Sequence, residues 1–333
     1  MEDKKVVLSV KDLNVKFTLR GQILHAIRGI SLDVYQGESL AIVGESGSGK
    51  SVFVKCAMGL LDANGYIDGG SILYNGMDLT KFQTDKDWLK IRGKEIAMVF
   101  QDPMTSLNPL KTIGKQIQEA VELHQGLKGK DAYKAVLEVL SDVGIDDPER
   151  RYKQYPHEFS GGMRQRVMIA MALACEPRVI IADEPTTALD VTIQAQILDL
   201  LRSLKDKIDS SIMFITHDLG VIAEMADYVV VMYAGRIVEQ GTAEEIFVHP
   251  AHPYTIGLMA SKPVVGKQVD KLYSIPGKVP NPINMPNYCY FKDRCEMCVN
   301  GCDGAYPEQI QISPTHKVSC YRYYEENLRK EGE

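Results

Sequence analysis

The stretch GESGSGKS has the clearest chemical meaning in this chain, because it fits the spacing G-x-x-x-x-G-K-[ST]. It directly follows the apolar run 39–43, so the pattern predicts a buried strand, a glycine-rich turn and a helix that begins near Lys50. The inward-pointing N–H groups of such a turn and the partial positive charge of the helix start bind a polyphosphate. We therefore predict a nucleoside triphosphate site formed by Gly44, Glu45, Ser46, Gly47, Ser48, Gly49, Lys50 and Ser51.

Four residues of this loop have specific expected roles. Lys50 should reach the β- and γ-phosphates as a point charge, and the Ser51 hydroxyl should complete a Mg²⁺ shell. Gly47 and Gly49 should let the backbone come close to the phosphates, where a side chain would clash.

Two adjacent acids, Asp183 and Glu184, follow the apolar run 179–182. This pattern is typical of a buried parallel strand whose carboxylates emerge at its C-terminal edge, where ligands of open α/β sheets bind. Asp183 suits Mg²⁺, usually through water. Glu184 can orient and polarise the water that attacks a phosphoryl group.

Two further polar side chains follow strand patterns and could reach the same site. Gln101 comes directly after one apolar strand, and His217 ends the run 212–216. A lone histidine is usually structural, but this one ends a third strand directed at the phosphates, so we predict a contact with the γ-phosphate. Gln101 is predicted to lie between the nucleotide and the following helical segment. With Ser51 and Asp183 it is also assigned to the Mg²⁺ site.

A second donor-rich turn is formed by Ser160, Gly161 and Gly162, ahead of the helical run 167–175. A serine and two glycines at a helix start form either an anion site or only an N-cap. Because the chain already has a phosphate loop, we expect this turn to contact a phosphate as well.

The composition of the 333 residues limits the function classes. A hydrophobic content of 45% supports a large core, and the length suggests a main domain with an appendage. The net charge of −6 argues against a nucleic-acid binder, which usually has a basic excess. No apolar run approaches the ~18 residues that span a bilayer, and the N-terminus lacks the apolar part of a signal peptide. We expect a cytosolic protein whose membrane role comes through partners.

The remaining pattern predicts an α/β fold with a divided sheet. Residues 1–40 alternate apolar and polar positions, as antiparallel strands do. The spacing from 112 to 143 is helical, so a helical insert divides the parallel sheet, and its surface is a candidate docking face. Phe17 stands on the antiparallel strands, where its ring could stack on adenine or belong to the core.

Five of the seven cysteines lie in the last 45 residues. A disulfide cluster is not expected in a reducing cytosol, so these thiols suggest a metal or iron–sulfur site. From spacing alone zinc and a 4Fe–4S cluster are comparable, because Cys295 and Cys298 form a common zinc pair and His316 offers a further ligand. Cys56 and Cys175 lie alone in apolar helical patterns and are expected in the core.

Taken together, these features closely resemble the ATPase subunits of ABC transporters, over about residues 5–260. The motifs occur in the family's order: the phosphate loop, Gln101, the SGG turn, the Asp183–Glu184 pair, the segment Ala188-Leu-Asp190 and His217. The resemblance implies an α/β P-loop ABC ATPase fold, with a RecA-like core, an antiparallel β subdomain and a helical subdomain at about 105–170.

The resemblance also implies how the site residues work. ATP and Mg²⁺ would lie between two such subunits, each giving Ser160 and its glycines to the γ-phosphate on the partner. Phe17 matches the position that stacks on adenine, and Asp190 belongs to a nucleotide-binding motif. One departure is FSGGM in place of the common LSGGQ, because Met163 cannot make the hydrogen bonds of glutamine.

The C-terminal part resembles one branch of this family, the oligopeptide/dipeptide (and nickel) importers. In that branch an HPxHPYT stretch opens a C-terminal extension, and this chain reads HPAHPYT at 249–255. The pattern C-x5-C-x6-C-x17-C matches the extension, in which some members bind a 4Fe–4S cluster. The resemblance thus assigns a cluster, with Zn²⁺ as the alternative and Cys298 as the spare thiol, to Cys289, Cys295, Cys302 and Cys320.

The resulting hypothesis is an ABC-type ATP-binding domain at 1–260 and a peptide-importer extension at 261–333. Such a subunit hydrolyses ATP at the cytoplasmic face of the cell membrane and powers di-/oligopeptide uptake. The implied partners are two integral-membrane permeases, a sister ATPase subunit or second copy, and indirectly an extracellular peptide-binding protein, but no nucleic acid.

Three alternatives remain at this point. The cargo could be nickel or an oligosaccharide. A non-transport ABC ATPase would usually have two cassettes or a long coiled coil. A zinc- or cluster-based regulator that only binds nucleotide would not need Glu184 and His217.

Overall fold

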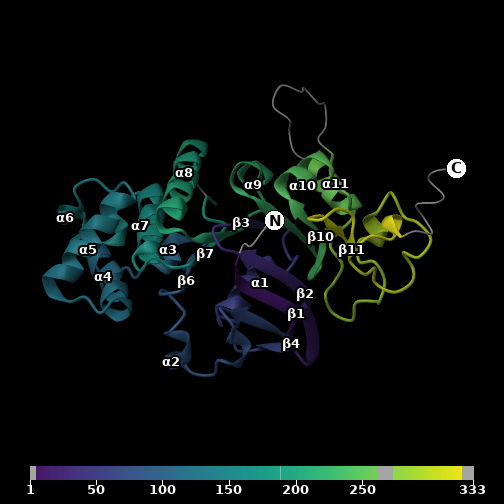
Figure 1. The fold of residues 1–333 in the computed structure, drawn as a ribbon, viewed down its shortest axis with the longest axis horizontal. Helices are drawn as coiled ribbons and strands as arrows, with labels where there is room; N and C mark the ends of the chain where they lie inside the picture. The colour runs from purple at the N-terminus through teal and green to yellow at the C-terminus, as the bar shows by residue number, and fades with distance from the viewer. Residues whose placement is uncertain (1–4, 188, 262–272, 325–333) are drawn as a thin grey trace. The chain divides into compact units, whose positions relative to one another are not determined.

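The computed structural model describes residues 5–187, 189–261 and 273–324. They form two compact units, and Figure 1 shows the helices and strands of both. The first unit contains, among these residues, 5–7, 34–39, 81–187 and 189–215, and the second contains 8–33, 40–80, 216–261 and 273–324. No helix in the described ranges is both long enough and apolar enough to cross a bilayer.

The second unit contains an antiparallel sheet in the order β2-β1-β4-β5, which confirms the strands expected from residues 1–40. Its strands are β1 Val6–Leu19, β2 Gln22–Tyr35, β4 Gly65–Tyr74 and β5 Met77–Asp78, of which the first two residues of β1 and the last two of β2 belong to the first unit. Buried and exposed positions alternate along the second half of β2, so one face of the sheet packs against the core while the other is solvated.

Apart from its first residue, Ser39, the phosphate-loop strand also lies in the second unit. β3 (Ser39–Val43) is buried at all five positions and runs parallel to β9 (Tyr228–Tyr233), while β10 (Arg236–Thr242) is antiparallel to β9. α1 (Lys50–Ala57) follows the glycine-rich turn and buries Phe53, Val54, Cys56 and Ala57. The predicted sequence of strand, glycine turn and helix is confirmed.

The first unit contains the parallel strands β6 (Ile96–Val99), β7 (Val179–Asp183) and β8 (Ser211–Ile215), which pair in the order β6-β7-β8. All positions of β7 and β8 are buried, as the apolar runs predict. The predicted helical insert lies between β6 and β7 (Figure 1). Its main helices, which pack on one another, are α4 Ile113–His124, α5 Gly129–Asp142 and α7 Gly161–Leu173.

The shorter and flanking elements complete the description. In the first unit they are α2 Asp85–Trp88, α3 Pro103–Ser106, α6 Pro148–Arg151, η2 Pro156–Glu158 and α8 Val191–Ile208. In the second unit they are η1 Leu79–Lys81 (whose last residue belongs to the first unit), α9 Leu219–Met225, α10 Ala243–Val248 and α11 Pro253–Ala260.

Two prolines begin short helices. Pro103 is the first residue of α3. His252 is extended, but Pro253 begins α11 and the His252 side chain caps it. Proline fits the first turn of a helix because its missing N–H has no helical partner there.

The C-terminal part of the second unit has little regular structure. It contains η3 (Lys292–Arg294), β11 (Ile310–Gln311), β12 (Lys317–Val318) and η4 (Tyr321–Tyr323), and β12 pairs with β10. Of the predicted extension at 261–333, residues 262–272 and 325–333 lie outside the described residues. The proposed boundary at 260/261 therefore stays a prediction.

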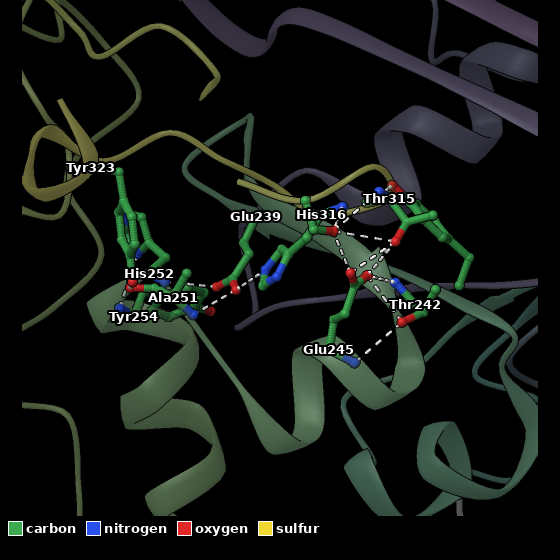
Figure 2. Close-up of polar contacts among 11 residues, drawn as sticks. Glu239, Thr242, Glu245, Ala251, His252, Tyr254, Thr315, His316 and Tyr323 are labelled. Atoms are coloured by element: carbon green, nitrogen blue, oxygen red, sulfur yellow. Dashed lines mark hydrogen bonds and ion pairs between the residues drawn. The ribbon is translucent and has the colours of Figure 1, made fainter. Parts of the chain in front are cut away.

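A buried polar network joins this C-terminal part to the rest of the second unit (Figure 2). The Glu239 carboxylate is fully buried and lies 2.7 Å from Nε2 of His316. It also accepts the backbone N–H groups of Ala251 and His252, at 2.7 and 2.9 Å. The segment around His316 is thus held by a buried charge of β10.

Candidate nucleotide site

The Lys50 side chain is folded onto its own loop in the second unit. Its ammonium Nζ donates to the carbonyl oxygens of Gly44 (2.7 Å) and Glu45 (3.1 Å), and to Ser48 Oγ (3.4 Å). Lys50 is only 7% exposed although it begins a helix. The loop therefore holds the ammonium group close to the start of α1, where the helix dipole also favours an anion.

The loop glycines are required for two different reasons. A Cβ at Gly44 would lie 2.2 Å from the Met232 carbonyl oxygen, so the close approach of β9 excludes a side chain there. Gly47 has a φ of +81° and nothing within 4 Å of a Cβ position, so its side faces open space. An open, donor-rich turn of this kind fits a polyphosphate.

The acidic residues of the first unit stand at the end of β7. Asp183 is the last residue of the strand and is 7% exposed. Glu184 has a left-handed φ of 47°, and its N–H donates to the Ile215 carbonyl of β8 at 2.7 Å. A non-glycine residue in this region is strained by about 1–3 kcal/mol, which neighbouring interactions must offset.

The Glu184 carboxylate is held by two donors. Gln101 Nε2 and Thr187 Oγ1 each donate to Oε2 of Glu184 at 2.8 Å. The structure therefore brings together Gln101 and Glu184, as the sequence predicts, and adds Thr187, which the sequence analysis did not single out. A hydroxyl three residues after an acid is too common a pattern to identify such a contact from sequence alone.

Three other predicted residues occupy helix starts or strand ends. Ser160 is the N-cap of α7, with Oγ accepting the Met163 N–H at 3.4 Å. Asp190 caps α8 by accepting the Ile193 N–H at 3.0 Å. His217 is exposed just beyond β8. These contacts account for part of each residue's geometry and leave the predicted nucleotide roles of Ser160, Asp190 and His217 as predictions.

Phe17 packs on the glycine of a neighbouring strand. It is half-buried on β1, and its ring lies where a Cβ of Gly65, its partner on β4, would come within 2.6 Å. The ring is therefore supported on one side by bare backbone. Ala188, part of the predicted segment Ala188-Leu-Asp190, lies outside the described residues.

Comparison with known proteins decides the family. The profile described as "ABC transporter" matches residues 27–187, and that described as "Oligopeptide/dipeptide transporter, C-terminal region" matches residues 238–302. The "Dipeptide transport ATP-binding protein DppD" of Bacillus subtilis is 52% identical over 95% of this chain and 94% of its own length. The chain belongs to the ABC transporter ATPase family, in its oligopeptide/dipeptide branch.

Further relatives agree with this assignment. The "Oligopeptide transport ATP-binding protein AmiE" of Streptococcus pneumoniae is 55% identical over 84% of this chain and 79% of its own length. Among solved structures, the ATP-binding cassette MJ0796, in a dimeric post-hydrolysis state with ADP and Pi, matches with a TM-score of 0.63 and 27% identity. That match covers 71% of this chain and 98% of the cassette. This ABC ATPase therefore uses ATP, with Mg²⁺, as the resemblance implied.

The thiols of this ABC ATPase influence one another electrostatically. Burial raises the pKa of Cys289 to about 11 and that of Cys320 to about 12, and in both cases the Cys302 thiol adds to the rise. Cys298 is exposed, and its Sγ lies 3.4 Å from the Lys292 carbonyl. Across the described ranges, however, no three His, Cys, Asp or Glu side chains form a group arranged to hold a metal ion.

The two remaining cysteines lie apart from this group, and only Cys56 is in the core as expected. Cys56 is buried in α1, and Cys175 is half-buried just after α7, with Sγ 3.5 Å from the Ala120 carbonyl. Burial raises the pKa of Cys56 to about 12 and that of Cys175 to about 11, so both thiols are protonated at neutral pH.

Proposed function

We propose that this ABC ATPase is the motor subunit of a di-/oligopeptide importer and acts at the cytoplasmic face of the cell membrane. The observation that carries the proposal is the likeness along nearly the whole chain, C-terminal part included, to a protein named for dipeptide transport. The partners would be two integral-membrane permeases and a sister ATPase subunit or second copy. An extracellular peptide-binding protein would deliver the cargo.

We assign the hydrolysis step to Glu184. Its carboxylate would take a proton from a water molecule as the water oxygen attacks the γ-phosphorus and the bond to the β-phosphate oxygen breaks, giving ADP and phosphate. The bonds from Gln101 and Thr187 to Oε2 fix the direction of the carboxylate. His217 would contact the γ-phosphate and Phe17 would stack on adenine.

The remaining assignments concern charge. Lys50 would exchange its loop carbonyls for the β- and γ-phosphates, and Ser51, Asp183 and Gln101 would supply the hard oxygen donors that Mg²⁺ prefers. Ser160, Gly161 and Gly162 would reach the γ-phosphate bound by a partner subunit. ATP then joins two subunits, and its hydrolysis weakens the contact between them.

Reconstitution tests the cargo. The complex of this chain with its permeases and sister subunit, in vesicles that contain the binding protein, is expected to hydrolyse ATP several-fold faster when di- or oligopeptides are added. If Ni²⁺ or an oligosaccharide stimulates ATP hydrolysis and peptides do not, that solute is the cargo. Equal ATPase activity with every solute, and no permease in the purified complex, would contradict the importer assignment.

We further propose that Cys289, Cys295, Cys302 and Cys320 hold a 4Fe–4S cluster. Four thiols are the donor set that such clusters use. In support, the pKa of Cys320 is raised by burial and also by Cys289, Cys295 and Cys302, so these thiols lie within electrostatic range of Cys320. Because the thiols do not form a ligand group as they stand, binding requires their side chains to turn toward a common centre and lose their protons.

Matched serine variants test the ligand set. Anaerobically purified protein is expected to be brown, with broad absorbance near ~400 nm and about four iron atoms per chain. Cys320→Ser should remove this absorbance, while Cys298→Ser should keep it, since Cys298 is the spare thiol. Colourless protein with one zinc per chain would favour Zn²⁺, and equal loss in both variants would contradict the assigned set.

A further inference from the structure

An ion pair links the C-terminal part directly to the phosphate loop. Arg294 donates from both terminal nitrogens to the Glu45 carboxylate, at 2.7 Å to Oε2 and 3.0 Å to Oε1. Arg294 is only 7% exposed. A two-point Arg–carboxylate contact is among the stronger and more directional polar interactions in proteins, and here the arginine is buried while the Glu45 side chain is 29% exposed. The second residue of the phosphate loop is thus fixed from 249 residues away in sequence.

The backbone of the same loop residue is fixed by a second group. The Glu45 N–H donates to the hydroxyl of Tyr254 at 2.7 Å, and Tyr254 is fully buried in α11. On the other side of that peptide, the Gly44 carbonyl accepts from Lys50 at 2.7 Å. The peptide plane between Gly44 and Glu45 is therefore held at both ends, and its orientation determines where Lys50 can rest.

The guanidinium of Arg294 has little freedom of its own. Its Nε donates to the Pro276 carbonyl at 2.7 Å, and one terminal nitrogen lies 3.3 Å from the Tyr233 hydroxyl. The rings of Tyr233, Tyr254 and Phe291 pack within 4.7–5.4 Å of one another beside it. Because these contacts hold the guanidinium in place, Arg294 determines the position of the Glu45 carboxylate.

We propose that Arg294 is a positioning residue for ATP binding: through Glu45, and together with Tyr254, it holds the phosphate loop in the conformation that accepts the triphosphate. The C-terminal part thereby contributes to the ATP site without touching the nucleotide. Cys289 and Cys295 lie at the two ends of the turn that carries Arg294. A bond formed at either thiol would therefore affect the phosphate loop through this turn.

The consequence for binding follows from a population argument. If only a fraction of the protein has the loop in the accepting conformation, the apparent Kd rises by the inverse of that fraction. Once ATP is bound and the loop is in place, the chemical step is unaffected. Loss of the ion pair should therefore raise the KM for ATP and leave kcat nearly unchanged, a division that a general loss of stability does not produce.

Uncharged substitutions provide the test. In the full-length protein, Arg294→Gln and Glu45→Gln are each expected to raise the Kd for the non-hydrolysable analogue AMP-PNP about tenfold in the presence of Mg²⁺. This change corresponds to roughly 1.4 kcal/mol of binding free energy. The double variant should be no worse than either single one, because the same interaction is lost. The matched control is Lys292→Gln, which removes a cation of the same turn that pairs with Asp303 instead and should leave the Kd unchanged.

Several outcomes would overturn the proposal. Additive effects of the two substitutions, or an unchanged Kd in Arg294→Gln together with a lower melting temperature, would reduce Arg294 to a structural role. A fall in kcat with constant KM would place it in the chemical step. If Arg294→Gln does not fold, Glu45→Gln and Arg294→Lys decide. Arg294→Lys keeps the charge without the planar fork, so it should give an intermediate Kd. Wild-type affinity in both variants would contradict the proposal.

Discussion

Replacement of Glu184 by Gln is expected to lower ATP turnover by roughly 10²- to 10⁴-fold while ATP binding is retained. The substitution removes the carboxylate that would accept the proton of the attacking water. It preserves the size of the side chain and leaves one oxygen that can accept the hydrogen bonds now made by Gln101 and Thr187. The left-handed backbone of Glu184 stays the same for either residue. Loss of rate can then be attributed to lost proton transfer.

Because hydrolysis is what would separate two ATP-joined subunits, Glu184→Gln should also accumulate a closed dimer in the presence of Mg²⁺ and ATP. Phosphate release measures turnover, and size-exclusion chromatography with light scattering measures dimerisation. Glu138→Gln is the matched control, because Glu138 is an exposed acid of α5 in the same unit. Unchanged phosphate release by Glu184→Gln would remove Glu184 from the role of general base.

The parts of this fold that could be predicted are those encoded by local patterns. The run 39–43 is β3 as predicted, because five successive apolar or small residues before a glycine turn have few alternatives to a buried strand. The helices α4 and α5 follow from their apolar spacing in the same way. The same local order places Gln101 after β6 and Glu184 after β7. These two strands pair directly and in parallel, which brings the two side chains within hydrogen-bond distance.

The parts that could not be predicted depend on contacts between distant segments. Glu45 and Arg294 lie 249 residues apart, and no periodicity connects them. An acid in a phosphate loop and an arginine beside a cysteine are each ordinary on their own. The arrangement of the thiols was likewise beyond reach, because a cysteine spacing constrains which ligands are available but not where each side chain points.

The segment HPAHPYT illustrates the difference between a family marker and its physical role. In the sequence it serves only to identify the branch of the family. In the structure, burial lowers the pKa of His252 to about 4, so its imidazole is neutral and Nδ1 accepts the Tyr254 N–H at 3.0 Å. This cap begins α11 and positions the Tyr254 hydroxyl on Glu45. The motif thus caps α11 and, through Tyr254, holds the phosphate loop in place.

The second large effect concerns stability. Replacement of Glu239 by Ala is expected to lower the free energy of unfolding of the second unit by about 3–5 kcal/mol, the usual cost of removing one partner from a buried polar pair. Glu239 is fully buried, and its two oxygens serve His316 and the N–H groups of Ala251 and His252 (Figure 2). Alanine leaves these donors without an acceptor in a place that water cannot easily enter.

Glutamine at position 239 tests whether the charge or only the shape matters. Its NH₂ group would replace one of the two carboxylate oxygens. In one orientation this NH₂ group would face the His252 N–H, and in the other it would face the Ala251 N–H and the His316 ring. Glu239→Gln should therefore be destabilising as well, though less than Glu239→Ala. Thermal and urea unfolding measure both variants, with the exposed acid Glu308 changed to Ala as a control expected to stay within about 0.5 kcal/mol of wild type.

Since the network includes the N-cap of α11, Glu239→Ala should also weaken ATP binding through Tyr254. Wild-type stability in Glu239→Ala would mean that the C-terminal part is held by its apolar contacts and by β12 alone.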